Sequence, residues 1–261
     1  MVARQERARG ITAGVGGEVA ALSSVVGGLE GASLTAVPTT SQSLPLETLR
    51  LQPRTGLLVA AGWQLAIKRT IDIIGASLAL VLLSPVLLAA AIAVKLSSPG
   101  PVFYVSDRVG KDGQVFRFAK FRSMRSNAEY EKPRLVELNE ATGPIFKVRD
   151  DPRMTKVGQI LRKLSIDEMP QLIHVLSGKM SLVGPRPPLQ EEVATYSEFE
   201  WQRLSVKPGM TCIWQVSGRS DLDFDTWVRM DIQYIEEWTV SGDLSLLVRT
   251  VPAVLTGRGA Y

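Results

Sequence analysis

An apolar run over residues 71–95 restricts the folds open to this 261-residue chain more than any other feature. Asp72 is the single charged residue in the run before Lys95. At about 1.5 Å per residue, an unbroken helix over this run is long enough to cross a bilayer once. The run therefore predicts a helix that is embedded in a membrane.

Two further features bear on how this helix meets the membrane. Ser84 and Pro85 lie near its middle, where a proline removes a helix hydrogen bond and Ser84 can bond the freed carbonyl. Basic residues flank both ends, which by the positive-inside tendency places both ends on the cytoplasmic side. A helix that breaks at Ser84-Pro85 and turns back satisfies both facts; a kinked helix that crosses once is the alternative. The flanking residues are Lys68, Arg69, Lys95 and Arg108.

The composition favours an anionic partner without identifying it. The net charge of +4 suits a membrane surface, phosphorylated substrates or nucleic acid. Cys212 is the only cysteine and His174 the only histidine, so the sequence excludes an intrachain disulfide and a cysteine–histidine metal cluster. We expect Cys212 to be a small core residue and His174 to be structural.

The chain divides into three parts. Residues 1–62 are rich in glycine, alanine, serine and threonine and lack periodicity, which predicts a disordered tail. Residues 63–97 hold the membrane helix, and residues 98–261 form a charged globular region. This order predicts an α+β fold: a membrane helix, then a small, mostly helical domain with one β-hairpin and amphipathic helices at the membrane interface.

Local patterns predict four elements in the globular region. Residues 101–124 alternate around the turn Lys111-Asp112-Gly113, which predicts a β-hairpin. Helical spacing predicts helices over residues 154–164, 167–176 and 224–238. Four tryptophans in this region suit a membrane–water interface, with core packing as the slightly favoured alternative for any one of them. They are Trp201, Trp214, Trp227 and Trp238.

An adjacent pair of carboxylates, Asp167 and Glu168, stands just before Pro170. Because proline is tolerated in the first helical turn, we expect a helix to start at Asp167 rather than at a capping box formed by Ser165 and Glu168. Asp167 is then either a simple helix cap or a nucleophile beside N–H groups that hold phosphate. In the second case Glu168 can bind Mg²⁺.

Basic residues that suit phosphate oxygens lie in four separate segments. Arg186 stands between two prolines, which restrict its backbone, although a surface loop gives the same pattern. The other candidates are Lys120, Arg122, Arg125, Arg162, Lys163, Lys207 and Arg219.

From residue 68 to the end, the chain resembles the bacterial sugar transferase family, the monotopic phosphoglycosyl transferases. The matching strings are KRTIDIIGA, LSPVLL, PGPVFYVSDRVGKDGQVFRFAKFRSM, DPRMTKVGQILRKLSIDEMPQL, MSLVGPRPP, KPGMTCIWQVSGRS and GRGAY. The sequence departs from the family's usual residues at Val105, His174, Lys179 and Cys212. None of these positions belongs to the acidic pair.

The resemblance implies a re-entrant helix broken at Ser84-Pro85 in the bacterial inner membrane, with the catalytic domain facing the cytoplasm. It implies that Asp167 is the nucleophile and that Glu168 binds Mg²⁺. It further implies that substrate phosphate or nucleotide contacts a set of basic residues. These residues are Arg162, Arg186, Lys120, Arg122 and Arg219.

The activity implied by the resemblance primes exopolysaccharide synthesis. Hexose 1-phosphate passes from a UDP-hexose, with glucose or galactose expected, to undecaprenyl phosphate, through a phosphosugar on Asp167 and with release of UMP. No nucleic-acid partner is expected, and the oligomeric state is open. Two alternatives remain: a metal-dependent glycosyltransferase that uses Asp221-Leu222-Asp223 and releases UDP, and a non-catalytic membrane assembly partner.

Overall fold

The computed structural model describes residues 56–218 and 222–257. Most of the predicted tail, residues 1–55, lies outside these ranges. The end of that predicted tail belongs to the fold, because the Leu57 N–H donates to the carbonyl of Ile235 at 2.8 Å. Leu57 and Ala60 also pack against the largest core cluster. The boundary of the folded part therefore lies earlier than residue 62.

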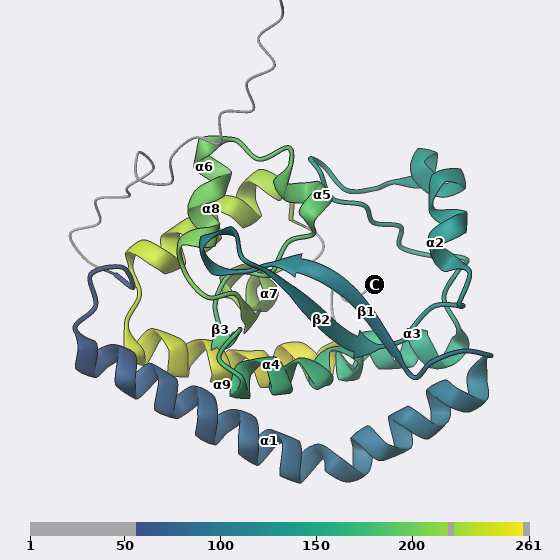
Figure 1. Ribbon diagram of the computed structural model, residues 1–261, viewed down its shortest axis with the longest axis horizontal. Helices are drawn as coiled ribbons and strands as arrows, with labels where there is room; N and C mark the ends of the chain where they lie inside the picture. The colour runs from purple at the N-terminus through teal and green to yellow at the C-terminus, as the bar shows by residue number, and fades with distance from the viewer. Residues whose placement is uncertain (1–55, 219–221, 258–261) are drawn as a thin grey trace, which may run out of the picture. The chain divides into compact units, whose positions relative to one another are not determined.

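Helix α1, Gly62–Ser97, passes through Pro85 without interruption. The Ser84 hydroxyl donates to the carbonyl of Val81 at 2.8 Å, which is the acceptor that Pro85 leaves without a partner. Figure 1 shows α1 bent near its middle, with both ends turned toward the globular domain. The predicted break is thus a bend within one helix, because Ser84 replaces the lost bond.

The remaining elements are short, and most of them are helical. In chain order they are β1 Phe103–Val109, η2 Lys111–Gly113, β2 Val115–Phe121, α2 Ala128–Glu131, η3 Lys132–Leu138, α3 Lys156–Lys163, η4 Ile166–Gln171, α4 Leu172–Leu176, β3 Ser181–Val183, α5 Gln190–Val193, α6 Glu198–Trp201, η5 Gln202–Ser205, β4 Gly209–Thr211, α7 Ile213–Ser217, α8 Phe224–Glu236 and α9 Val240–Thr256. This mixture of helices with a little sheet agrees with the predicted α+β class.

Strands β1 and β2 form the predicted antiparallel hairpin, from the pair Phe103–Phe121 to the pair Val109–Val115. Asp112 and Gly113 both have positive φ at the turn, as a tight hairpin connection needs. Strands β3 and β4 form a parallel pair that the sequence patterns did not predict.

Helices α3 and α8 lie where the periodicity predicts helices. Both have a side-chain cap: Thr155 accepts from the Gly158 N–H, and Asp223 accepts from the Thr226 N–H. The helix predicted over residues 167–176 is instead two segments, η4 and α4. Helix α9 was missed, because neither its start at Thr239 nor the interior Pro252 gave a clear signal.

The largest core cluster joins α1, β2, α4, β3, α8 and α9. Trp238 belongs to it, while Trp214 stacks on Trp227 in a second cluster with ring centroids 4.1 Å apart. Core packing is therefore confirmed for these three tryptophans, and Trp201 is half-buried. Trp63 at the start of α1 is the exposed one, at 64%.

Polar residues in the first turns of α1 fasten it to the globular domain. The Lys68 ammonium lies 2.6 Å from the Asp243 carboxylate of α9 and also donates to the Tyr234 hydroxyl and the Val183 carbonyl. Arg69 donates to the last carbonyls of α4 at 2.6 and 2.7 Å. Asp72 accepts from Ser181 and from the Leu182 N–H. Lys68 and Arg69 therefore attach α1 to the globular domain, in addition to providing the positive charge from which the membrane topology was predicted.

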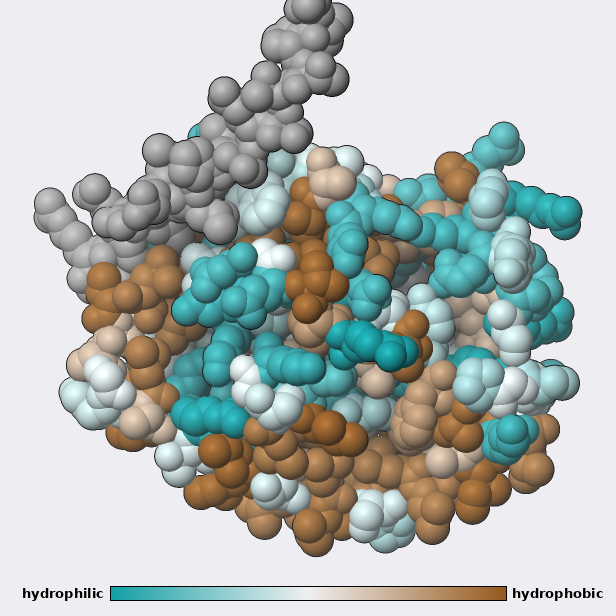
Figure 2. Space-filling model, viewed as in Figure 1, coloured by the Kyte–Doolittle hydropathy of each residue, from teal (hydrophilic) through white to brown (hydrophobic). Residues whose placement is uncertain are grey.

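The rest of α1 exposes apolar side chains. Only 11% of its most apolar 18-residue window is buried, although a helix in the core of a soluble protein is mostly buried. Figure 2 shows a continuous apolar band over the α1 side of the molecule. Helices α3, α4 and α9, which pack against α1, also expose large apolar residues. These are Ile160, Leu164, Ile173, Leu244, Val248, Val251 and Leu255.

We predict that Lys68→Met destabilises the fold by about 3–5 kcal/mol, because Asp243 would stay buried without its cation. The measurement is the midpoint of thermal unfolding of the purified protein in detergent. Lys95→Met is the matched control in the same helix, since Lys95 makes one exposed hydrogen bond, to Gly100. Equal midpoints for the two variants would contradict the anchoring role of Lys68.

Candidate active site

The acidic pair lies in η4, which packs against strand β2. Asp167 is buried, at 4% exposure, and Glu168 is half-buried. The segment begins at Ile166, one residue before the predicted start, and is a 3₁₀ helix, with the Glu168 N–H donating to the Ser165 carbonyl. An α-helix starting at Ile166 would need an N–H from Pro170, which proline lacks. The Ser165 side chain makes no capping bond, so the capping box is absent.

Burial sets the electrostatics of this pair. It raises the pKa of Asp167, while Lys120 and Arg162 act in the opposite direction. Burial and the neighbouring Asp167 charge raise the pKa of Glu168, against the attraction of Lys120, Arg186 and Arg162. Burial and mutual repulsion both disfavour the charged forms of these two carboxylates, so a bound cation would be attracted to them. The pair therefore differs from a solvated helix cap.

Two of the predicted basic residues face the acidic pair without being neutralised. Neither the Lys120 nor the Arg162 side chain makes a hydrogen bond or ion pair with a described residue. The Lys120 ammonium lies 5.6 Å from the ring centroid of Tyr104. Burial, and then repulsion from Arg162, lowers the pKa of Lys120 to about 8. Such cations favour an anionic ligand, because a negative charge would offset their desolvation.

Arg108 also lies at the site, although the sequence suggested only that it flanks the membrane helix. Its guanidinium donates to the Pro187 carbonyl at 3.1 Å, and the Val109 N–H donates to Pro188 at 2.9 Å. Strand β1 thus holds the proline-rich segment that presents Arg186. Burial and the nearby Arg186 lower the pKa of Arg108 to about 10. Two like charges held this close suit an anion between them.

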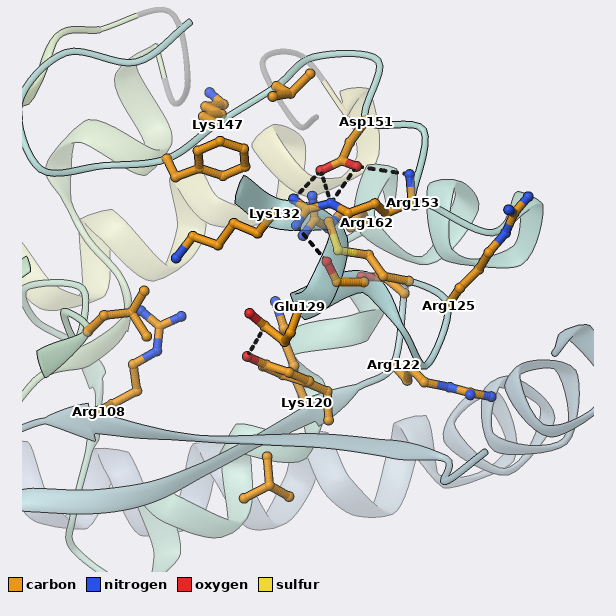
Figure 3. Close-up of a pocket in the computed structure, with 18 of the residues that line it drawn as sticks. Arg108, Lys120, Arg122, Arg125, Glu129, Lys132, Lys147, Asp151, Arg153 and Arg162 are labelled. Carbon is orange, nitrogen blue, oxygen red and sulfur yellow. Dashed lines mark hydrogen bonds and ion pairs between the residues drawn. The ribbon is translucent and has the colours of Figure 1, made fainter. Parts of the chain in front are cut away.

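A cavity of about 600 Å³ opens beside these residues (Figure 3). Cationic side chains in its lining outnumber carboxylates nine to four, which favours an anionic ligand. The cations are Arg108, Lys120, Arg122, Arg125, Lys132, Lys147, Arg153, Arg162 and Arg186. A second cavity of about 40 Å³ shares Arg108, Lys120 and Arg186 with the first and is lined by Glu168. Glu168 therefore lies next to the cationic cavity, and the buried Asp167 beside it is attracted by two cations of the cavity wall, Lys120 and Arg162.

Other predicted basic residues have different positions. The Arg122 guanidinium donates to the Val94, Ser98 and Pro99 carbonyls at the end of α1, and Figure 3 shows it directed away from the cavity centre. Arg122 thus lines the cavity, but its guanidinium is already bonded to carbonyls at the end of α1, which argues against a role in binding phosphate. Arg219 lies outside the described residues.

Lys163 and Arg125 are exposed, and Lys207 lies near Gly178 rather than in either cavity. Asp223, of the alternative Asp221-Leu222-Asp223 metal site, caps α8 through Thr226 at 2.7 and 3.0 Å. Asp221 lies outside the described residues.

His174 and Cys212 have structural surroundings, as expected. His174 Nε2 accepts from the Ala119 N–H at 3.2 Å, and its ring packs against Phe116 and Phe118. Burial lowers the pKa of His174, so the neutral ring supports strand β2 next to the site. Cys212 is fully buried.

Within residues 56–218 and 222–257, no group of three or more acidic, histidine or cysteine side chains forms a complete metal cage. Mg²⁺ commonly binds through one or two carboxylates together with substrate phosphates and water. Asp167 and Glu168 fit that smaller donor set. A metal would bind here together with a phosphorylated ligand.

Residues 63–257 match the family described as bacterial sugar transferase. The chain belongs to this family. The bacterial sugar transferases similar to it include the galactosyl transferase CpsE of Streptococcus agalactiae, which is 46% identical over 194 residues, or 74% of this chain and 43% of that protein. The exopolysaccharide production protein ExoY of Sinorhizobium fredii is 39% identical over 88% of this chain and 99% of its own length.

A third bacterial sugar transferase is the UDP-glucose:undecaprenyl-phosphate glucose-1-phosphate transferase of Escherichia coli. It is 42% identical over 75% of this chain and 41% of that protein. The chain thus spans less than half of CpsE and of the Escherichia coli protein, and nearly all of ExoY.

Proposed function

We propose that this sugar transferase moves hexose 1-phosphate from a UDP-hexose, UDP-glucose or UDP-galactose, to undecaprenyl phosphate, as a first step of exopolysaccharide synthesis. The observation that carries the proposal is the adjacent pair of buried Asp167 and half-buried Glu168, with Glu168 next to a cavity rich in cations. The names of the relatives support the substrate classes, because they mention galactosyl transfer, exopolysaccharide production, and a UDP-glucose donor with undecaprenyl phosphate.

In the first step, an Asp167 carboxylate oxygen attacks the sugar-bearing phosphorus. A new P–O bond forms to Asp167, and the bond to the UMP oxygen breaks, so that UMP leaves with the electron pair. Arg108, Lys120, Arg162 and Arg186 bind the diphosphate oxygens and stabilise the charge that develops on them. The burial of Arg108 and Lys120 strengthens the contacts that these two residues make.

In the second step, a phosphate oxygen of undecaprenyl phosphate attacks the same phosphorus and releases the Asp167 carboxylate. The products are an undecaprenyl diphosphate hexose and the free enzyme. Burial disfavours the free Asp167 carboxylate and therefore favours its attack in the first step. Lys120 and Arg162, which stabilise the charged form, favour its release in the second step.

Mg²⁺ is part of the proposal, with Glu168 as its main protein ligand. The ion would offset the repulsion between the attacking carboxylate and the diphosphate. This role is supported by the position of Glu168, which lines the small cavity with Arg108, Lys120 and Arg186.

We further propose that α1 lies in one leaflet of the inner membrane and that the catalytic domain faces the cytoplasm. The bend at Pro85 and the two ends turned toward the domain support a re-entrant arrangement. The exposed apolar residues of α3, α4 and α9 would then lie at the same interface. In this arrangement, a water-soluble donor and a lipid acceptor can both reach the same site.

We predict that Asp167→Asn lowers turnover about a thousandfold or more, because the amide cannot act as the nucleophile. The assay is UMP release from UDP-glucose and UDP-galactose in the presence of undecaprenyl phosphate. Asp107→Asn, the same change at an exposed residue of β1, is the control and should keep wild-type turnover. More than about a tenth of wild-type turnover in Asp167→Asn would be inconsistent with the covalent mechanism.

Glu168→Gln should raise the Mg²⁺ concentration needed for half-maximal UMP release and slow the first step by at least about tenfold. Loss even of an indirect partner of a bound metal commonly costs about 10–100-fold. A Mg²⁺ titration of the wild type and the variant measures both effects. Superimposable titrations with equal maximal rates would remove Glu168 from the site.

Both chain ends should be cytoplasmic if α1 is re-entrant. Cysteines introduced near the N-terminus and at Tyr261 can be labelled from either side of the membrane, with little background because Cys212 is fully buried. We expect both to be protected from an impermeant reagent in intact cells. Labelling of one end alone would establish a helix that crosses the bilayer once.

A further inference from the structure

Four carboxylates line the cationic cavity, and three of them are neutralised. Asp151 forms an ion pair with Arg153 at 2.6 Å. The other two pairs are Glu191 with Lys132 at 3.2 Å and Glu192 with Arg186 at 3.8 Å. These three carboxylates orient the cations of the wall.

Glu129, in α2, is the exception among the described residues. Its carboxylate makes no ion pair there and accepts one hydrogen bond, from the Tyr104 hydroxyl at 2.9 Å. Tyr104, on β1, also lines the cavity, and Figure 3 shows Glu129 near Lys120 on the cavity wall. The side chain is solvent-exposed, so a ligand in the cavity can reach it. An ionised carboxylate has about four acceptor positions, so most of those on Glu129 remain open.

Tyr104 keeps this carboxylate in one orientation. Burial and the bond to Glu129 raise the pKa of Tyr104 to about 12, so its hydroxyl remains a donor at neutral pH. The Tyr104 ring also lies under the Lys120 ammonium, which in turn attracts Asp167 and Glu168. Lys120 therefore links the Tyr104–Glu129 pair to the acidic pair.

We propose that Glu129, positioned by Tyr104, accepts hydrogen bonds from vicinal hydroxyl groups of the UDP-hexose and helps to determine sugar specificity. The inference rests on the proposed function, since it assigns a part of the same donor. A carboxylate repels phosphate, so this part of the wall does not suit the diphosphate. UDP-hexose offers hydroxyl donors on the hexose and on the ribose, and one N–H on the uracil. A carboxylate can accept from two adjacent hydroxyl groups at once, which favours a diol as its partner.

Glu129→Gln tests this with the full-length protein in detergent. We expect about a tenfold or greater rise in KM for UDP-glucose or UDP-galactose, whichever the wild type uses, with a smaller change in kcat, because a charged hydrogen bond is lost. Tyr104→Phe should change KM in the same direction by less. Glu131→Gln, two residues along α2 and outside the cavity lining, is the control.

Inhibition by UMP distinguishes the two diols, because UMP carries the ribose and lacks the hexose. An unchanged inhibition constant in Glu129→Gln assigns the contact to the hexose, whereas a parallel rise assigns it to the nucleoside and overturns the role in sugar specificity. For the hexose, donors that lack one hydroxyl provide a direct check. For the donor that lacks the contacted hydroxyl group, Glu129→Gln and the wild type should have equal KM values.

The inference is overturned if Glu129→Gln matches Glu131→Gln in KM and in UMP inhibition while the wild type turns over a UDP-hexose. Wild-type protein that releases no UMP from any UDP-hexose would refute the proposed function itself. Thermal unfolding of each variant shows whether a change in KM reflects loss of folded protein. If Glu129→Gln folds poorly, the KM of Tyr104→Phe tests the same contact independently.

Discussion

The ion pair between Lys68 and Asp243 joins the first described helix to the last, and the position of the active site depends on it. A buried lysine needs a buried partner, and Asp243, Tyr234 and the Val183 carbonyl together bind the Lys68 ammonium. With this end of α1 fixed, its apolar side faces outward, and η4 packs against both α1 and β2. The acidic pair is therefore held at a defined position relative to the apolar band.

A second constraint is the concentration of positive charge around η4. Lys120 and Arg162 have no neutralising partner among the described residues, and the pKa values of Lys120 and Arg108 are lowered by burial. Such an arrangement costs folding free energy, which an anionic ligand would offset. The exposed apolar face and the charged cavity thus belong to the same part of the fold. This proximity fits an enzyme with one soluble and one lipid substrate.

Local sequence signals predicted the hairpin, α3 and α8, because turn residues and helical spacing act over a few positions. Pro170 correctly predicted that a helix begins close to the acidic pair. The helix starts at Ile166 rather than at Asp167, and the proline is accommodated because the segment is a 3₁₀ helix. The site was predicted less completely, since its geometry is non-local. Lys120 and Arg122 look equivalent in sequence, yet β2 ends at Phe121 and Arg122 turns to the end of α1. The positions of Arg108 and Glu129 in the site depend on the packing of β1 against α2 and against the segment that follows β3.

The central claim is a phosphosugar carried by Asp167, and peptide mass spectrometry tests it most directly. The protein would be incubated with the UDP-hexose in the absence of undecaprenyl phosphate and then digested. The account predicts one added hexosyl phosphate on the peptide that contains Asp167, formed with release of UMP and lost when undecaprenyl phosphate is added. Release of UMP only when the acceptor is present, with no modified peptide at any time, would contradict it.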